Sequence, residues 1–157
     1  MHFQISPITD IRSAIPLLAN WHHQEWPHLN SKSYDLKARI TDYEKIAEAK
    51  TFPAMFVAHR NGNPLGSARL IDNDMDTHPE LSPWLASLYV LKEFRHQGIG
   101  SALIRKIENT ATELNFETIY LFTEDKQSIY NKQAWQILAN ETYCDQAITI
   151  MHKRLNR

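Results

Sequence analysis

Residues 88–101 of the chain read Leu88-Tyr89-Val90-Leu91-Lys92-Glu93-Phe94-Arg95-His96-Gln97-Gly98-Ile99-Gly100-Ser101. They lie between an apolar run that is typical of a buried strand and an amphipathic pattern that is typical of a long helix. Glycine has no Cβ, so the turn at Gly98 and Gly100 can approach an anion closely and direct backbone N–H groups at it. The first helical turn adds unpaired N–H groups and the positive end of the helix dipole, and Lys92 and Arg95 add charge nearby. The segment therefore predicts a cradle for a pyrophosphate group.

A Gly-x-Gly turn after a strand also has other interpretations. An ordinary strand-to-helix turn also uses glycine to relieve backbone strain, and that interpretation stays open on the turn alone. A Walker phosphate loop needs a Lys-Ser/Thr pair after its last glycine, whereas Ser101-Ala102 follows here. A dinucleotide-binding fingerprint needs a third spaced glycine, which the segment lacks.

Regular patterns extend outward from this segment in both directions. Toward the N-terminus, they predict a short strand at Phe3 and Ile5, helices that begin near Asp10 and Ser33, and a hairpin at Asn61-Gly62. The hairpin and later strands are expected at residues 53–60, 64–71, 84–90, 118–123, 135–138 and 147–151, with helices at 98–114 and 128–133. The order β-α-α-β-β-β-α-β-α-β-β predicts an α/β fold, a single mixed sheet with helices on its faces.

Composition narrows the function classes. A chain of 157 residues with 43% apolar and 22% charged residues suits one soluble domain, expected over residues 1–157. Lys and Arg number 17 against 18 Asp and Glu, so no global field favours nucleic acid or an anionic membrane. Cys144 is the only cysteine, and the N-terminus has no signal-peptide pattern, so we expect a cytoplasmic protein without disulfides. The histidines at 22, 23 and 28 have no completing ligand nearby, so we expect no metal.

Two segments together resemble the GNAT family of N-acetyltransferases. Arg95, Gly98 and Gly100 match the family signature Gln/Arg-x-x-Gly-x-Gly/Ala after its fourth strand. Residues 129–135, Ile129-Tyr130-Asn131-Lys132-Gln133-Ala134-Trp135, resemble its Phe/Leu-Tyr-Glu-Lys-x-Gly-Phe segment. The chain departs from the family in two places, because Ala134 replaces a glycine and Thr123 stands where many members have an asparagine.

The resemblance implies the acyl-CoA N-acyltransferase fold, with a mostly antiparallel sheet whose central parallel strands, 84–90 and 118–123, splay apart. Acetyl-CoA would be the co-substrate. Its pantetheine arm would pair with the backbone of Leu88, Tyr89 and Val90 like an added strand. The N–H groups of His96, Gln97, Gly98, Ile99, Gly100 and Ser101 would hold its pyrophosphate beside Arg95. The hydroxyl of Thr123 would bond the arm or a water.

The resemblance also implies the chemistry. A neutral amine would attack the thioester directly in a ternary complex, with a backbone N–H near Val90 stabilising the oxyanion. Tyr130 would be the general acid that protonates the departing thiolate. The pattern alone favours another interpretation, in which Tyr130 is a core aromatic at a helix edge. No acid lies within residues 84–90, so the base is expected to be a water chain that ends on a carboxylate.

The acceptor is expected to be a cationic small amine or a peptide N-terminus. Asp72, Asp74, Asp76 and Glu80 lie in a segment with no Lys or Arg between residues 69 and 92, so they could form an acid-lined mouth. Glu25, Trp21 and Trp26 could form the facing wall. A solvated acidic loop with buried tryptophans is the alternative. Two other function classes stay open, a non-catalytic acyl-CoA sensor and an interaction module of the same fold, as a monomer or homodimer.

Overall fold

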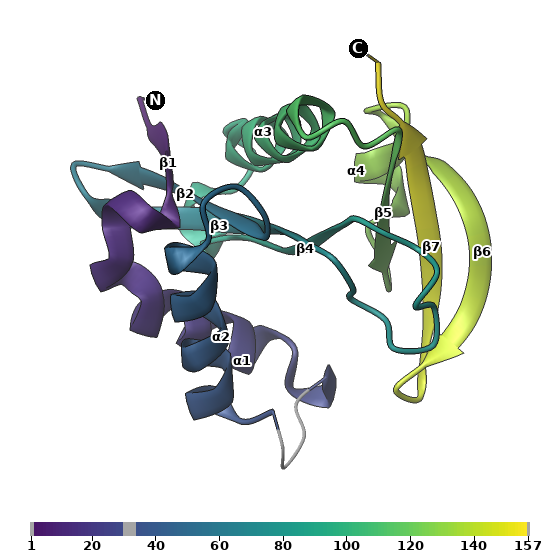
Figure 1. The fold of residues 1–157 in the computed structure, drawn as a ribbon, viewed down its shortest axis with the longest axis horizontal. Coiled ribbons are helices and arrows are strands. Elements are labelled where there is room, and N and C mark those ends of the chain that lie inside the picture. The colour runs from purple at the N-terminus through teal and green to yellow at the C-terminus, as the bar shows by residue number, and fades with distance from the viewer. Residues whose placement is uncertain (1, 30–33, 157) are drawn as a thin grey trace.

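The strands of the computed structural model, which describes residues 2–29 and 34–156, form a single mixed sheet (Figure 1). Within these residues the sheet has seven strands in the order β1-β2-β3-β4-β5-β7-β6. The strands are β1 (Gln4–Pro7), β2 (Ala54–Arg60), β3 (Asn63–Ile71), β4 (Trp84–Val90), β5 (Thr118–Thr123), β6 (Gln136–Tyr143) and β7 (Gln146–Arg154). Only β4 and β5 run parallel among these neighbours. The predicted fold class is confirmed.

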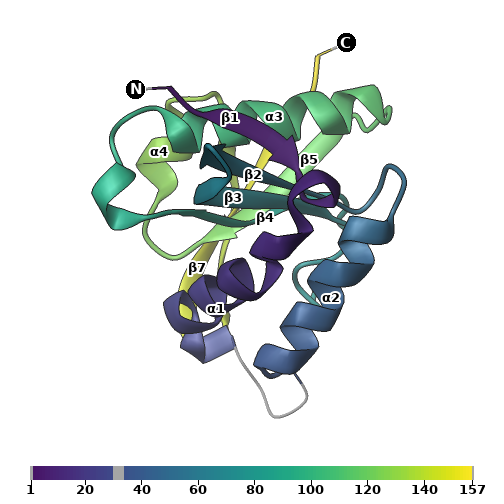
Figure 2. The ribbon, with the colours of Figure 1, turned by 90° about the vertical axis from the view of Figure 1, so that its left-hand side faces the viewer.

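Helices cover both faces of this sheet (Figures 1 and 2). The α-helices are α1 (Ile15–Glu25), α2 (Leu36–Glu48), α3 (Ile99–Glu113) and α4 (Gln127–Asn131), and the 3₁₀ helices are η1 (Ile8–Ala14), η2 (Pro27–Leu29) and η3 (Lys92–Phe94). The helix α3 lies on one face, whereas α1 and α2 lie on the other. No helix in the described part of the chain is long and apolar enough to cross a membrane.

The apolar stripe of α3 anchors the core on its face of the sheet. Ile99, Leu103, Ile107 and Ala111, which the sequence placed on this stripe, are buried at 0–1% exposure. They pack with the inward residues of β2 to β5 and with Tyr130 and Trp135. On the opposite face, Met75 of the segment 72–83 packs in a separate cluster with Trp84, Ile148 and Ile150. Burial on both faces explains why residues 84–90 form a near-continuous apolar run.

The two parallel strands separate soon after they meet. One register pair, Trp84 with Tyr120, joins β4 to β5 among the described residues, and the Tyr120 N–H donates to the Pro83 carbonyl at 3.0 Å. On the other side of β4, the register with β3 shifts by one residue at a bulge, where Ser87 has a φ of +55°. A bulge bends its strand and increases the local twist. The expected splay of strands 84–90 and 118–123 is confirmed.

The first helical segment differs from its prediction. The sequence indicated one helix from Asp10, but a 3₁₀ helix ends at Ala14 and α1 begins at Ile15. Ile11 breaks the helical backbone with a φ of −142°, and Pro16 lies in the first turn of α1, where its missing N–H has no cost. The second helix is capped by Asp35, which accepts the Ala38 N–H at 2.9 Å. The predicted cap, Ser33, lies outside the described residues.

The backbone at Ala134 retains the conformation that glycine prefers, with a φ of +69°. A left-handed backbone costs a non-glycine residue about 1–2 kcal/mol, of which the larger entropy of unfolded glycine offsets about 0.5–1 kcal/mol. We therefore expect Ala134→Gly to raise the free energy of unfolding by about 0.5–1 kcal/mol, measured by urea denaturation. Ala49, whose φ is −70°, is the matched control, and Ala49→Gly should destabilise. Equal losses at both positions would contradict this account.

Candidate functional site

The turn between β4 and α3 presents unused N–H groups. His96 and Gly98 both have left-handed backbones, with φ values of +63° and +86°, and Gly98 caps α3. The first bond of the helix runs from the Ala102 N–H to the Gly98 carbonyl at 3.0 Å. The N–H groups of Ile99, Gly100 and Ser101 therefore precede the helical bonding pattern and point out of its end. Such an end binds anions.

The two glycines of the turn have different roles in the folded chain. A Cβ at Gly98 would meet nothing within 4 Å, but its φ of +86° strains any other residue. A Cβ at Gly100 would lie 3.8 Å from Val90 Cγ2, which is an ordinary contact. The fold itself therefore needs glycine at position 98 and not at position 100. Any demand for glycine at position 100 comes from a molecule that binds there.

Arg95 contacts the open edge of β4. The Leu91 N–H donates to the Leu65 carbonyl at 2.9 Å, so by strand alternation the polar groups of Val90 point away from β3 and toward β5. Arg95 Nε donates to the Val90 carbonyl at 2.8 Å, and its guanidinium lies 5.6 Å from the centre of the Tyr89 ring. Arg95 thus lies at the head of the splay, next to the strand edge on which the pantetheine arm was expected.

Tyr130 lies in α4 on the same face of the sheet as α3. Its side chain is 7% exposed and packs edge-on against Trp135, with ring centres 6.0 Å apart. Burial raises the pKa of the phenol, so the hydroxyl stays protonated at neutral pH. Among the described residues, none hydrogen-bonds to this hydroxyl, which leaves it available to a bound molecule. Gln133 Nε2 donates to Ser101 Oγ at 3.4 Å, and this contact joins the Tyr130 segment to the start of α3.

Thr123 has a local bonding partner. Its hydroxyl oxygen accepts the Lys126 N–H at 3.0 Å, at the start of α4. The residue is 9% exposed and its β5 position pairs with Thr149 of β7. The hydroxyl can still donate one hydrogen bond, so its predicted contact with the cofactor arm stays a prediction.

The predicted aromatic wall lies against β4. The ring centres of Trp21 and Trp26 lie 5.6 and 6.3 Å from that of Tyr89, and Trp26 also contacts His22 at 5.5 Å. Both tryptophans are half-buried, so part of each indole faces solvent. Glu25 is exposed at the end of α1. The structure thus brings the aromatic residues of the wall together with the strand that borders the splay.

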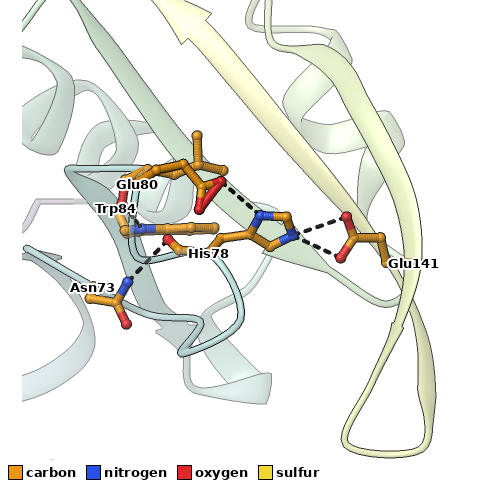
Figure 3. Close-up of polar contacts among 6 residues, drawn as sticks. Asn73, His78, Glu80, Trp84 and Glu141 are labelled. Atoms are coloured by element: carbon orange, nitrogen blue, oxygen red, sulfur yellow. Dashed lines mark hydrogen bonds and ion pairs between the residues drawn. The ribbon is translucent and has the colours of Figure 1, made fainter.

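The acids of residues 72–83 mostly bind within this segment or to β6. Asp72 accepts the Ser82 hydroxyl at 2.7 Å, and Asp76 accepts the Tyr143 hydroxyl at 3.2 Å. His78 lies between Glu80 and Glu141, with Nε2 2.8 and 3.0 Å from the two Glu141 oxygens (Figure 3). These contacts, together with buried Met75, fasten the segment over β7 and β6.

Asp74 differs from the other acids of this segment. Its side chain is half-buried, and burial raises the pKa of its carboxyl to about 7 although Arg69 and Arg39 act to lower it. Of the four predicted mouth acids, Asp74 is the one that interacts electrostatically with Arg69 and Arg39, on the face of the sheet covered by α1 and α2. Whether these acids contact an acceptor stays a prediction.

A buried polar network lies beneath α1 and α2, and the sequence did not predict it. His22 Nδ1 lies 2.6 Å from the Tyr43 hydroxyl and its Nε2 lies 3.0 Å from Ser67 Oγ. Arg69 donates from Nε and Nη2 to Ser87 Oγ at 3.1 and 2.9 Å, inside the β4 bulge. Ser67 and Arg69 are alternate polar residues of β3, but two residues are too short a pattern to predict a network. The residues of α1 and α2 that join it are distant in sequence. The network explains why β4 keeps a polar residue at its bulge.

His22 makes the fold sensitive to acid. Burial, with Arg69 and Arg39, lowers the pKa of His22 well below 6.5, so the folded chain holds it neutral. Unfolded His22 gains a proton below about pH 6.5, so stability is full above that pH and falls below it, by up to about 1.4 kcal/mol per pH unit. We expect the unfolding free energy of His22→Gln to fall less steeply than that of the wild type from pH 7.5 to 5. Parallel pH slopes in the two proteins would contradict this expectation.

One more pair crosses the splay. His28 of η2 lies against the carboxylate of Glu124, the residue that follows β5, through Nε2 and Oε1. The two residues are far apart in sequence, and neither belongs to a recognisable motif, so the sequence carried no signal for their contact. The part of the chain that the structure describes contains no group of three side chains arranged to ligate a metal.

A family model matches most of the chain. The model described as the acetyltransferase (GNAT) family aligns with residues 15–135. This range contains the β4–α3 turn, Thr123 and Tyr130. No curated protein matches the chain in sequence.

Solved structures share the fold at low sequence identity. A GNAT-family acetyltransferase from Staphylococcus aureus Mu50 is 19% identical, with a TM-score of 0.74 over 99% of this chain and 100% of that chain. The Salmonella typhimurium protein yncA, solved with its cofactor acetyl-CoA, is 15% identical, with a TM-score of 0.75 over 98% and 94%. An aminoglycoside 6′-N-acetyltransferase complexed with coenzyme A is 16% identical, with a TM-score of 0.74 over 98% of both chains.

Proposed function

The chain belongs to the acetyltransferase (GNAT) family, and from this we propose that it transfers an acetyl group from acetyl-CoA to a primary amine. The observation that carries the proposal is the splay itself. On the α3 face, the gap between β4 and β5 is bordered by three N–H groups that precede the helical bonds of α3 and by Tyr130, whose hydroxyl has no hydrogen-bond partner among the described residues. An extended polar arm, an anion and a leaving group would each find a matching feature there.

The residues present fit acetyl-CoA. The Val90 polar groups that point into the splay suit an amide of the pantetheine arm, which would displace or share the Arg95 contact. The N–H groups of residues 99–101 suit the pyrophosphate, beside which Gly100 leaves room. When bound, acetyl-CoA supplies the thioester that the amine attacks. Tyr130, kept protonated by burial, donates its proton to the departing sulfur.

The amine would approach on the opposite face, where α1 and η2 border the splay. Trp21, Trp26 and Tyr89 present partly exposed aromatic rings there, and each contact of a cation with such a ring contributes about 0.5–1 kcal/mol. Glu25 and Glu124 add negative charge at the same end of the molecule. These features support a cationic acceptor, either a small amine or a peptide N-terminus.

The experiment is a screen for acetylation with thiol release as its readout. Polyamines, aminoglycosides, amino acids and peptides with free N-termini are each offered with acetyl-CoA, and thermal shifts with acetyl-CoA and with ATP are measured in parallel. We expect a thermal shift with acetyl-CoA and thiol release with at least one cationic amine. A shift without thiol release from any acceptor would favour the acyl-CoA sensor, and the absence of a shift would refute cofactor binding.

A further inference from the structure

The pair of His28 and Glu124 links the two walls of the splay. His28 belongs to η2, directly after α1, and Glu124 follows the last residue of β5. Nε2 of the imidazole contacts Oε1 of the carboxylate, which leaves Nδ1 as the other ring nitrogen. The His28 and Glu124 side chains are 26% and 37% exposed, so both also contact solvent. Nε2 itself is shielded from solvent and makes no hydrogen bond within the described residues, so its contact with Oε1 is an ion-pair contact.

The side chains of β5 and the contact with His28 together show which face of the sheet the pair occupies. Ile119 and Leu121 pack in the cluster under α3, whereas Tyr120 and Phe122 pack in the opposite cluster with Trp84. Glu124 lies in the bend that follows β5, and its contact with His28 of η2 is what assigns it to a face. The helix α1, from which η2 extends, lies on this same face (Figures 1 and 2). The pair thus lies across the sheet from Tyr130 and from the α3 turn.

This face is the one from which the proposed acceptor arrives. A primary alkylamine is protonated at neutral pH and has no lone pair for attack until it loses a proton. A base on the acceptor side must take that proton, and imidazole is the side chain that exchanges protons near neutral pH. A carboxylate in contact with one ring nitrogen orients the ring and leaves the other nitrogen to accept a proton. His28 and Glu124 supply these two groups in contact with each other.

We propose that His28 Nδ1, with the ring oriented by Glu124, accepts the proton of the acceptor ammonium. This inference rests on the proposed acetyl transfer. One N–H bond of the ammonium breaks and a new N–H bond forms at Nδ1, which frees the lone pair that attacks the acetyl carbon. The C–S bond then breaks, and Tyr130 protonates the sulfur. The attacking nitrogen loses its second proton to restore Tyr130, and His28 releases its proton to solvent.

The test compares two acceptors of similar shape and different basicity. Benzylamine is protonated at pH 7 and needs a base, whereas benzhydrazide is neutral and does not. We expect His28→Gln to lower kcat/KM for benzylamine at pH 7 by about a hundredfold or more and for benzhydrazide by less than about threefold. The residual benzylamine rate of this variant should rise about tenfold per pH unit up to pH 9, because the neutral amine then forms in solution.

Two further variants separate chemistry from structure. Glu124→Gln keeps a polar side chain of the same shape beside the ring and removes the charge, so we expect about a tenfold loss with benzylamine and a shifted pH profile. His78→Gln removes another imidazole that contacts glutamates, at the edge of the sheet, and should leave both rates unchanged. The acetyl-CoA thermal shift should be the same in all of these proteins.

Each other outcome overturns a defined part of the inference. Equal losses with both acceptors in His28→Gln would make the pair a structural clamp of the acceptor side. Unchanged benzylamine kinetics at pH 7 would remove His28 from proton transfer. If the wild type binds acetyl-CoA but acetylates neither these probes nor any amine of the acetylation screen, the proposed function fails, and the inference fails with it.

Discussion

Tyr130→Phe is expected to lower kcat by about a hundredfold to ten-thousandfold and to leave the affinity for acetyl-CoA unchanged. The hydroxyl is proposed to act only as the thiolate leaves, so its loss removes an interaction of the transition state and not of the ground state. Burial raises the pKa of this phenol, so the hydroxyl still has its proton when the thiolate leaves. Steady-state kinetics with a cationic amine from the acetylation screen, and a thermal shift with acetyl-CoA, measure the two quantities.

The stability of the variant should match that of the wild type. No described residue hydrogen-bonds to the Tyr130 hydroxyl, and a phenyl ring retains the contact with Trp135. Tyr143→Phe is the matched control, because it removes a phenol that binds Asp76 near the β6–β7 turn, away from α4. A kcat for Tyr130→Phe within about threefold of the wild type would assign Tyr130 to the core. Loss of acetyl-CoA binding would also make it a packing residue.

The elements that border the site were the easiest to predict from the sequence. The predicted bounds of 84–90 and 118–123 coincide with β4 and β5. Both strands pack apolar side chains on the two faces of the sheet, so their local pattern directly records their environment. The β4–α3 turn was predictable for a similar reason, because glycine at a left-handed position and an amphipathic helix are both local signals. The splay came from the family resemblance, since no local pattern reports which strands part.

The acceptor side was harder to predict because long-range side-chain pairs define it. His22 contacts Tyr43 and Ser67 across 21 and 45 residues, and neither contact leaves a periodic trace. The acidic segment shows a different limit, since its charge pattern predicted an acid-lined mouth but no partner for any single carboxylate. In the structure Asp72 and Asp76 bind neighbouring hydroxyls. Charge along the chain reports how many acids are present and not what each one binds.

Substitution of the glycines in the β4–α3 turn should remove the stabilisation by acetyl-CoA. At about 100 times its dissociation constant, the ligand should raise the unfolding free energy of the wild type by about 2.7 kcal/mol. Gly100→Val should abolish most of this increase, because its side chain would fill the space beside the N–H groups of the helix end. Without ligand, the variant should be nearly as stable as the wild type, since a Cβ there meets only Val90 Cγ2, at 3.8 Å.

Gly98 needs a different control, because its backbone alone makes substitution costly. Gly62, in the β2–β3 turn, has a φ of +82° and open space around its Cβ position, as Gly98 has at +86°. Gly98→Ala and Gly62→Ala should therefore lose similar stability without ligand, about 0.5–1 kcal/mol each after the offset by the entropy of unfolded glycine. Only Gly98→Ala should also lose the thermal shift with acetyl-CoA, since its strain distorts the turn that directs the N–H groups. If acetyl-CoA stabilised both Gly98→Ala and Gly100→Val as much as the wild type, its phosphates would bind elsewhere. Substitutions at both glycines of the turn would then have no effect on binding.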